Sequence, residues 1–288
     1  ELANGGDGYI PPPEQHVLGG YNTWAARSAG LEVQAEPKIV EAAIQLLEES
    51  SGKRRKSLQP PTGPLVEAVL GAKPDAYWQL DELAGPIATD SSPHNRNAHF
   101  EEGVAFFLPG AAGVSPERVN NPGNRAAHFA GGRLHGRFSE LAEDYTVVLW
   151  CWNGMPLDAR ETTGWLMSRD HAHGLSASGD HVGLSGGPQA GKLVFQHGRK
   201  IQLTGKTQLE RWKWYQVMVV RKRDQVTLLL NGQVEASGKV ESMPTANDLF
   251  VGGRSDNRDN WEGRIDEVAV FYRALSTREI AAISRTGF

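Results

Sequence analysis

The chain has 288 residues, of which 39% are hydrophobic and 22% are charged, and its formal net charge is −4. This composition suits a globular protein with a substantial core, and it lacks the basic excess that is typical of nucleic-acid-binding proteins. No run of about 18 apolar residues occurs, so the sequence predicts no transmembrane helix. The single cysteine, Cys151, excludes an internal disulfide, and its apolar neighbours predict a buried, unreactive thiol. The 33 glycines and 8 tryptophans favour a turn-rich all-β protein.

The chain opens with an irregular segment. Residues 4–21 read NGGDGYIPPPEQHVLGGY, which has neither helical nor strand periodicity. Loops of this composition commonly line sites on a rigid scaffold. The sequence starts at Glu1 without an initiator methionine or a signal peptide, so we expect it to be a piece of a longer open reading frame.

A helix is predicted at residues 36–50, because Pro37 suits the first turn and apolar residues recur on one face. Four basic residues follow at 53–56, ahead of a proline pair. Such a run is either a solvated linker, the more ordinary case, or a contact for an anionic surface. A short apolar helix leads out of it. We therefore expect an N-terminal part at 1–50, a linker at 51–73 and a β-domain at 74–288.

From Asp75 onward the pattern is that of short β-strands. The sequence Asn231-Gly232 is a strong signal for a two-residue hairpin, and Ser276 and Glu279 form a capping box ahead of a C-terminal helix. A strand about every ten residues predicts a two-sheet antiparallel sandwich. The expected strands are rich in valine, leucine and aromatic residues or are bounded by turn residues: 126–130, 145–152, 164–169, 192–197, 214–222, 225–230, 248–252 and 264–272.

Four stretches occur in a recognisable order: AYWQLDE at 76–82, Asp90 with SSPHN directly after it at 91–95, RAAHFAGG at 125–132 and GRIDEVAVFYRALSTREI at 263–280. With them, residues 74–288 resemble the laminin-G-like, concanavalin A-like jelly-roll domains. The resemblance implies an all-β jelly roll of two antiparallel sheets with a short C-terminal helix. It further implies an extracellular or periplasmic monomer that binds a glycan, a glycoconjugate or a protein surface.

The glucanases of this fold carry an E-x-D-x-x-E strand, which places their carboxylates on one face. This chain lacks that motif, and its nearest acidic residues, Glu262, Asp266 and Glu267, have a different spacing. We therefore expect the jelly roll to bind rather than to catalyse.

Two groups of residues are candidates for ligand binding. Trp212, Trp214 and Trp261 are interpreted either as a platform on which sugar rings stack or as packing at the core and its rim. The loop at 254–260 contains Asp256 and Asp259, and it is either a ligand or cation loop or a polar turn.

The laminin-G resemblance also implies a calcium site. It places Asp90, after the first strand, close to Asp266, and hard oxygen ligands suit Ca²⁺. The alternative is that Asp266 only accepts backbone hydrogen bonds. His171 and His173 share a face if they lie on a strand, which suits metal chelation, but an exposed hairpin is the more ordinary interpretation.

The opening segment resembles the end of the catalytic domain of the neutral (alkaline, non-lysosomal) ceramidases, which are zinc amidases. The residues that match are Asn4, Gly8, Tyr9, Pro13, Glu14 and Tyr21. The resemblance implies that Tyr9 ligates zinc in an intact parent enzyme and that Tyr21 contacts the substrate amide or the oxyanion. Asn22 stands where this family usually has a glutamate.

A catalytic zinc needs at least three protein ligands, and the family's other ligands lie upstream of this loop. We therefore expect no amidase activity from this chain alone. The resulting hypothesis is a non-catalytic glycan-binding module that follows a ceramidase-like catalytic domain. The alternative is a protein-binding adhesion domain without affinity for sugars.

Overall fold

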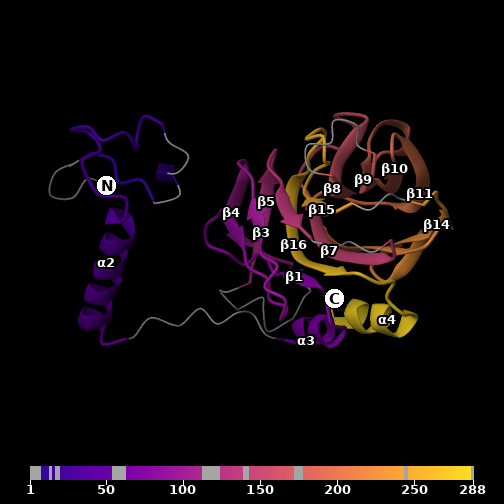
Figure 1. Cartoon of the computed structure of the whole chain (residues 1–288), viewed down its shortest axis with the longest axis horizontal. Coiled ribbons are helices and arrows are strands. Elements are labelled where there is room, and N and C mark those ends of the chain that lie inside the picture. The colour runs from indigo at the N-terminus through magenta and orange to yellow at the C-terminus, as the bar shows by residue number, and fades with distance from the viewer. Residues whose placement is uncertain are drawn as a thin grey trace. The chain divides into compact units, whose positions relative to one another are not determined.

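The computed structural model describes residues 8–12, 15–16, 20–53, 63–111, 124–138, 143–171, 178–242 and 246–286. The chain divides into two compact units, unit 1 at Glu1–Gln59 and unit 2 at Pro60–Phe288 (Figure 1). No helix in the described ranges is long and apolar enough to cross a membrane.

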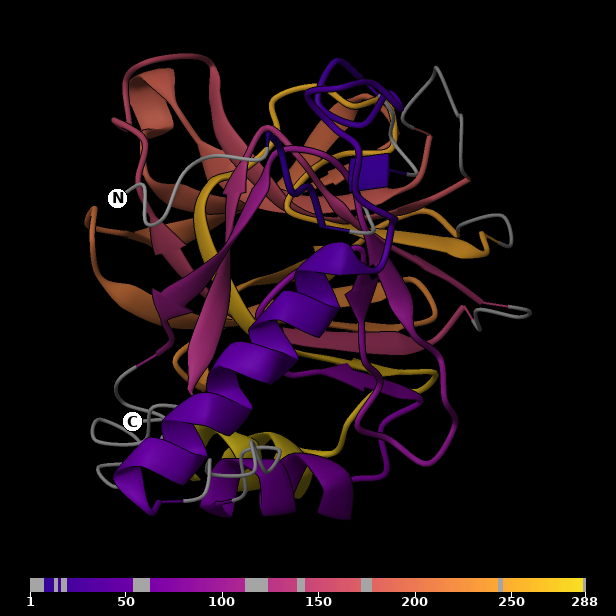
Figure 2. The ribbon, with the colours of Figure 1, turned by 90° about the vertical axis from the view of Figure 1, so that its left-hand side faces the viewer.

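The described part of unit 1 comprises an irregular segment and, after it, the helix α2, Ala35–Ser51, which is continuous in both views (Figures 1 and 2). The helix ends at Gly52, whose left-handed φ of 64° suits a glycine C-cap. Ala35 is the only residue of the helix that is buried, and Leu46 and Leu47 are each 65% exposed. The predicted helix at 36–50 is therefore confirmed, and its apolar residues Ile39, Leu46 and Leu47 are exposed.

Unit 2 is a jelly-roll sandwich of two antiparallel sheets, as the sequence predicts. Sheet I has the order β14-β13-β12-β7-β16-β5-β4, with β1 also paired to β16, and sheet II has the order β11-β10-β9-β8-β15-β6-β3-β2. The strand bounds are β1 Ala76–Trp78, β2 Ile87–Ala88, β3 Ala98–Phe100, β4 Val104–Pro109, β5 Arg125–Ala130, β6 Leu134–Arg137, β7 Tyr145–Asn153, β8 Thr162–Asp170, β9 Asp180–Ser185, β10 Lys192–His197, β11 Lys200–Gln208, β12 Trp214–Lys222, β13 Gln225–Leu230, β14 Gln233–Lys239, β15 Asp248–Val251 and β16 Glu262–Phe271.

The main core lies between the two sheets, which face each other in Figure 1. Because side chains alternate along a strand, Val147, Leu149 and Cys151 of β7 point into this core. Cys151 is 1% exposed, and burial raises the pKa of its thiol well above the ordinary value. The expected burial of the thiol is confirmed, and its raised pKa supports the expectation that it is unreactive.

The Asn231-Gly232 hairpin is also confirmed. Leu230 of β13 pairs with Gln233 of β14, so the loop has two residues. Asn231 and Gly232 have φ values of 49° and 76°. Two successive positive φ angles match the right-handed twist of the flanking strands, which explains the preference for Asn-Gly here.

Two helices cover part of the outer face of sheet I. The helix α3, Pro64–Gly71, and the helix α4, Thr277–Thr286, lie side by side (Figures 1 and 2). Leu65 and Val69 of α3 and Ile283 of α4 form a second apolar cluster with Val148 and Trp150 of β7. The short helix that the sequence analysis assigned to a linker therefore packs in unit 2.

The predicted capping box begins α4. The Ser276 amide N–H donates to Glu279 Oε2 at 2.8 Å, and the Glu279 N–H donates to Ser276 Oγ at 3.4 Å. Arg273 adds a bidentate ion pair to Glu279, with distances of 2.6 and 3.0 Å. The Arg273 hydrogen bonds, together with those from Ser276, lower the pKa of Glu279 to about 2.

Candidate functional site

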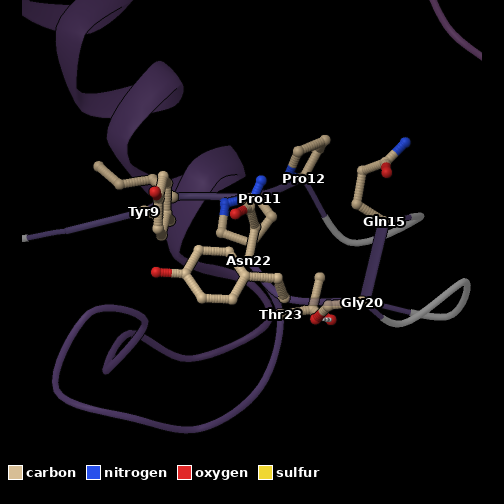
Figure 3. A pocket seen from close by; sticks show the side chains of 9 residues that line it. Tyr9, Pro11, Pro12, Gln15, Gly20, Asn22 and Thr23 are labelled. Carbon is tan, nitrogen blue, oxygen red and sulfur yellow. Dashed lines mark hydrogen bonds between the residues drawn. The ribbon is translucent and has the colours of Figure 1, made fainter.

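The irregular segment of unit 1 lines an open hollow of about 380 Å³. The labelled side chains of Tyr9 and Gln15 lie at opposite ends of its lining, with Pro11 and Pro12 between them (Figure 3). The rings of Tyr9 and Tyr21 meet edge to face, with centroids 5.7 Å apart. The structure thus brings the two tyrosines of the ceramidase resemblance together. Other residues of that resemblance, Asn4, Pro13 and Glu14, lie outside the described residues.

The three predicted tryptophans of unit 2 separate into two environments. Trp261 is fully buried in the core between the sheets. Gly164 makes room for its ring, since a Cβ at that position would lie 3.0 Å from the indole. Trp261 is therefore core packing and not part of a sugar platform. Trp212, in contrast, is 62% exposed in the turn before β12, and Trp214 is half-buried.

Trp214 begins a row of side chains that crosses sheet I. It pairs with Trp152 of β7, Trp152 pairs with Arg264 of β16, and Arg264 pairs with His128 of β5. Residues directly opposite one another in a sheet share a face. This is the outer face, because Trp150, two residues before Trp152, packs in the cluster under α3 and α4. All four side chains of the row are half-buried.

Hydrogen bonds to backbone carbonyl oxygens attach Trp212 and Arg211 to the same end of β7. The Trp212 N–H donates to the Asn153 carbonyl oxygen at 3.0 Å. Arg211 Nη2 donates to the Gly154 carbonyl oxygen at 2.7 Å. We name Trp152, Trp212, Trp214, Arg211 and Arg264 together the indole–arginine surface.

Each arginine of this surface lies over an indole ring. The guanidinium carbon of Arg264 is 4.6 Å from the centroid of Trp152, and that of Arg211 is 4.3 Å from the centroid of Trp212. Such cation–π contacts fix the plane of the guanidinium group as well as its position. Burial lowers the pKa of Arg264 from its very high ordinary value. Burial and then the charge of Arg264 lower the pKa of the adjacent His128, which Glu262 opposes.

Sequence reasoning identified Trp212 and Trp214 but missed Trp152, Arg211, Arg264 and His128. Trp152 lies in an apolar strand and was expected only as part of it. Its relation to Arg264 is set by the pairing of β7 with β16, which are more than 100 residues apart in sequence. Alternation along β7 was the one available signal, because it separates Trp152 from the inward-pointing Cys151.

The loop at 254–260 is held by polar contacts within itself and with β8. Asp256 accepts two hydrogen bonds from Arg254, each 2.8 Å long. Ser255 Oγ donates to Asp170 Oδ2 at 2.7 Å. The carbonyl oxygen of Asp259 accepts from the Trp165 N–H at 3.0 Å. These contacts are those of a structured turn, and ligand binding by Asp256 and Asp259 remains a prediction.

Asp90 and Asp266 accept hydrogen bonds from different segments. Asp90 accepts from the N–H groups of Tyr77, Ser92 and Arg96 and from Ser92 Oγ, at 2.7–2.8 Å. Asp266 Oδ2 accepts from the Ala111 N–H at 2.8 Å. Four hydrogen bonds occupy the acceptor sites of one carboxylate. The structure thus gives Asp90 a role in holding the turn at 90–96, and calcium coordination by the pair remains a prediction.

Within the described ranges, no three histidine, cysteine or acidic side chains gather in a group suited to a metal ion. His171 is exposed, and its amide N–H donates to Asp170 Oδ1 at 2.9 Å. His173 lies outside the described residues.

The comparisons with known proteins support the assignment of unit 2 as a jelly-roll sandwich. A profile described as the concanavalin A-like lectin/glucanases superfamily, Laminin_G_3, matches residues 132–281. The chain belongs to this superfamily. No curated protein matches the sequence.

Several solved structures resemble the superfamily domain of this chain. One is domain 4 of AbnA, a GH43 extracellular arabinanase from Geobacillus stearothermophilus, which was solved in complex with arabinotriose. It is 16% identical to this chain, with a TM-score of 0.54, and the match covers 75% of this chain and 98% of that one. The binding domain of Paraclostridial Mosquitocidal Protein 1 is 15% identical, with a TM-score of 0.55 and coverage of 75% and 52%. The botulinum neurotoxin serotype D binding domain is 14% identical, with a TM-score of 0.52 and coverage of 74% and 52%. The chain thus spans about half of the two toxin domains, and these likenesses show the fold.

Proposed function

We propose that unit 2 is a non-catalytic glycan-binding module that binds its ligand on the indole–arginine surface. The observation that carries this proposal is the gathering of Trp152, Trp212 and Trp214 at one end of sheet I, with exposed or half-exposed rings. A flat indole face suits the apolar face of a sugar ring, and buried aromatic anchors dominate the energetics of many interfaces.

The resemblances support the same class of function. AbnA domain 4 was solved with arabinotriose, and the botulinum neurotoxin DC binding domain was solved in complex with SialylT. The AbnA domain is described as part of an extracellular enzyme. We propose that this chain acts outside the cytoplasm, as a monomer that attaches an enzyme to a glycan or glycoconjugate, and the extracellular neighbour supports this location.

The test is binding of the full chain to an array of neutral and acidic glycans, with Trp212→Ala as the main variant. We expect loss of one exposed indole to weaken binding about tenfold, or about 1.4 kcal/mol, with an unchanged melting temperature. Trp24→Ala is the matched control, because Trp24 is 66% exposed in unit 1, close to the 62% of Trp212. Absence of binding to every glycan would overturn the proposal and favour the protein-binding alternative.

The parent enzyme is the second part of the proposal. We propose that unit 1 continues a ceramidase-like catalytic domain, in which Tyr9 is a zinc ligand and Tyr21 contacts the substrate. The contact between the two tyrosine rings supports this assignment. One tyrosine does not make a catalytic zinc site, so the chain alone is expected to be inactive. Zinc-dependent hydrolysis of an N-acyl sphingosine analogue by this chain would contradict that expectation.

A further inference from the structure

The two arginines of the indole–arginine surface each donate to one backbone carbonyl oxygen. Arg264 Nη1 donates to the Pro109 carbonyl oxygen at 3.1 Å, and Arg211 Nη2 donates to the Gly154 carbonyl oxygen at 2.7 Å. The Nε atom of each is buried and has no acceptor among the described residues. Within the same residues, neither guanidinium group forms an ion pair. Among the described residues, the hydrogen bonds of both guanidinium groups therefore go to neutral carbonyl oxygens.

Neighbouring acids are already engaged by other cations. Glu262, beside Arg264 on β16, lies 3.7 Å from Arg160. Glu210, beside Arg211, accepts from Lys213 at 2.7 Å. These two acids are thus paired with Arg160 and Lys213, and in the part of the chain that the structure describes no acid forms an ion pair with either indole-stacked arginine. A surface with this arrangement is complementary to an anion.

The geometry of a guanidinium group favours particular kinds of anion. Its planar fork matches the two oxygens of a carboxylate, and stacking on an indole holds the fork in place before a ligand arrives. Burial and the charge of Arg264 lower the pKa of His128, which favours the neutral form of this histidine. The positive charge of the surface therefore comes from the arginines. Sugar stacking on indoles and carboxylate binding by arginines are then available within one surface.

We propose that the indole–arginine surface recognises an acidic glycan whose uronate carboxylates bind Arg211 and Arg264 while its sugar rings stack on the adjacent tryptophans. This inference rests on the proposed function and specifies its ligand class. It differs from a general affinity for sugars because a neutral glycan of the same backbone lacks the groups that the arginines bind.

The experiment compares polygalacturonate, alginate and hyaluronan, each beside its own methyl ester, by affinity electrophoresis of the full chain. The ester keeps the backbone and removes the charge. We expect at least one acid form to bind about tenfold more tightly than its ester, because only the acid form can accept charge-assisted hydrogen bonds from the two arginines. Raising the ionic strength from about 0.05 to 0.5 M should weaken the acid form and leave the ester unchanged.

Single substitutions test which arginines bind the carboxylates of the acid form. Arg264→Gln and Arg211→Gln should each weaken binding of the acid form about tenfold and leave the ester unchanged. Arg264→Lys keeps the charge but loses the planar stack, so it should fall between Arg264→Gln and the unaltered chain. Arg199→Gln is the control, because Arg199 is exposed in the turn between β10 and β11 of the other sheet. The melting temperature of each variant shows that it is folded.

The outcomes separate the two proposals. Equal affinity for the acids and the esters overturns the uronate inference and leaves the glycan-binding function standing. A loss with Arg199→Gln as large as that with Arg264→Gln also overturns the inference, because it indicates unspecific attraction by charge. Binding to none of the six polymers overturns the inference as well, and binding to no glycan at all on the array removes the proposed function with it.

Discussion

At the residue scale, one buried ion pair joins the two sheets of unit 2. Arg221 of β12, in sheet I, donates to both oxygens of Asp180 of β9, in sheet II, at 2.7 and 2.8 Å, and both side chains are fully buried. Tyr145 donates its hydroxyl to Asp180 at 2.9 Å, and His197 Nδ1 lies 2.8 Å from the same carboxylate. Each lone pair of Asp180 thus has a partner.

Removing one charge of this pair should be costly. Asp180→Asn leaves the Arg221 charge buried and uncompensated, and we expect a loss of about 3–5 kcal/mol in the free energy of unfolding. This corresponds to a melting temperature lower by roughly 10 °C. Asp180→Asn combined with Arg221→Gln should recover part of the loss. Urea unfolding checks both values, and a loss below about 1 kcal/mol in the single variant would contradict the role given to this pair.

The same pair sets a dependence on pH. Burial alone raises the pKa of Asp180, but the His197 hydrogen bond, the Arg221 charge and the Tyr145 hydroxyl outweigh it and hold the pKa of this carboxyl below its ordinary value. A carboxyl whose pKa is lower in the folded than in the unfolded state stabilises above the unfolded pKa, about 3.9 for Asp. Stability should therefore be lost as the pH falls below about 4, and Asp180→Asn should flatten that part of the stability curve.

Residue-level prediction from sequence was reliable where the local signal is sufficient. Asn231-Gly232 and the Ser276–Glu279 capping box depend on neighbours within a few residues, and both are confirmed. The environment of Trp261 depends instead on Gly164, and that of Trp152 on Arg264. These contacts join segments that are far apart in the sequence. Alternation along β7 therefore indicates which way Trp152 points, but no local pattern shows what either tryptophan packs against.

At the element scale, the edges of the two sheets are joined by one carboxylate. Strand β14 ends sheet I and β11 ends sheet II. Glu235 of β14 accepts from the backbone N–H groups of Lys206 and Thr207 of β11 at 2.7 and 2.8 Å, and from Thr207 Oγ1 at 2.8 Å. Backbone groups of an otherwise unpaired edge are thereby satisfied, which reduces the tendency to pair with another chain.

The edge contact gives a prediction for Glu235. Glu235→Ala leaves two edge N–H groups without their acceptor, and we expect a loss of about 1–3 kcal/mol in the free energy of unfolding. Aggregation on warming should begin at a lower temperature, because the edge of β11 becomes available for pairing. Light scattering during a thermal ramp measures the second effect. Glu102→Ala, at an exposed position of the same unit, is the control, and an equal response of the two variants would contradict the prediction.

Element prediction was strongest for the central strands. Strands β7, β12 and β13 are rich in valine, leucine and aromatic residues, so their patterns are clear. Strand β11, KIQLTGKTQ, is mostly exposed and contains a glycine, which leaves little apolar periodicity to recognise. It was missed for that reason.

At the scale of the whole molecule, the chain comprises two units with very different cores. Unit 2 encloses a continuous core between its sheets and a second cluster under α3 and α4. Unit 1 has few buried apolar residues, and Ile39, Leu46 and Leu47 of its helix are exposed. The sequence predicted a division of the chain close to the boundary between the two units, but it assigned α3 to the linker. Only tertiary packing shows what Leu65 and Val69 of this helix contact.

The division gives a prediction about proteolysis. Because the core of unit 2 is made within unit 2, cleavage between the units should leave the sandwich folded. Trypsin has four successive sites at residues 53–56, directly before the boundary at Gln59 and Pro60. Brief digestion should therefore yield a fragment that begins close to residue 57 and extends through the sandwich, as mass spectrometry can establish. This fragment should melt within about 2 °C of the main transition of the intact chain, since removal of an independent unit changes the stability of the other by less than about 1 kcal/mol. Fragments cut inside the sandwich while residues 1–53 stay intact would show instead that the larger unit depends on the smaller one.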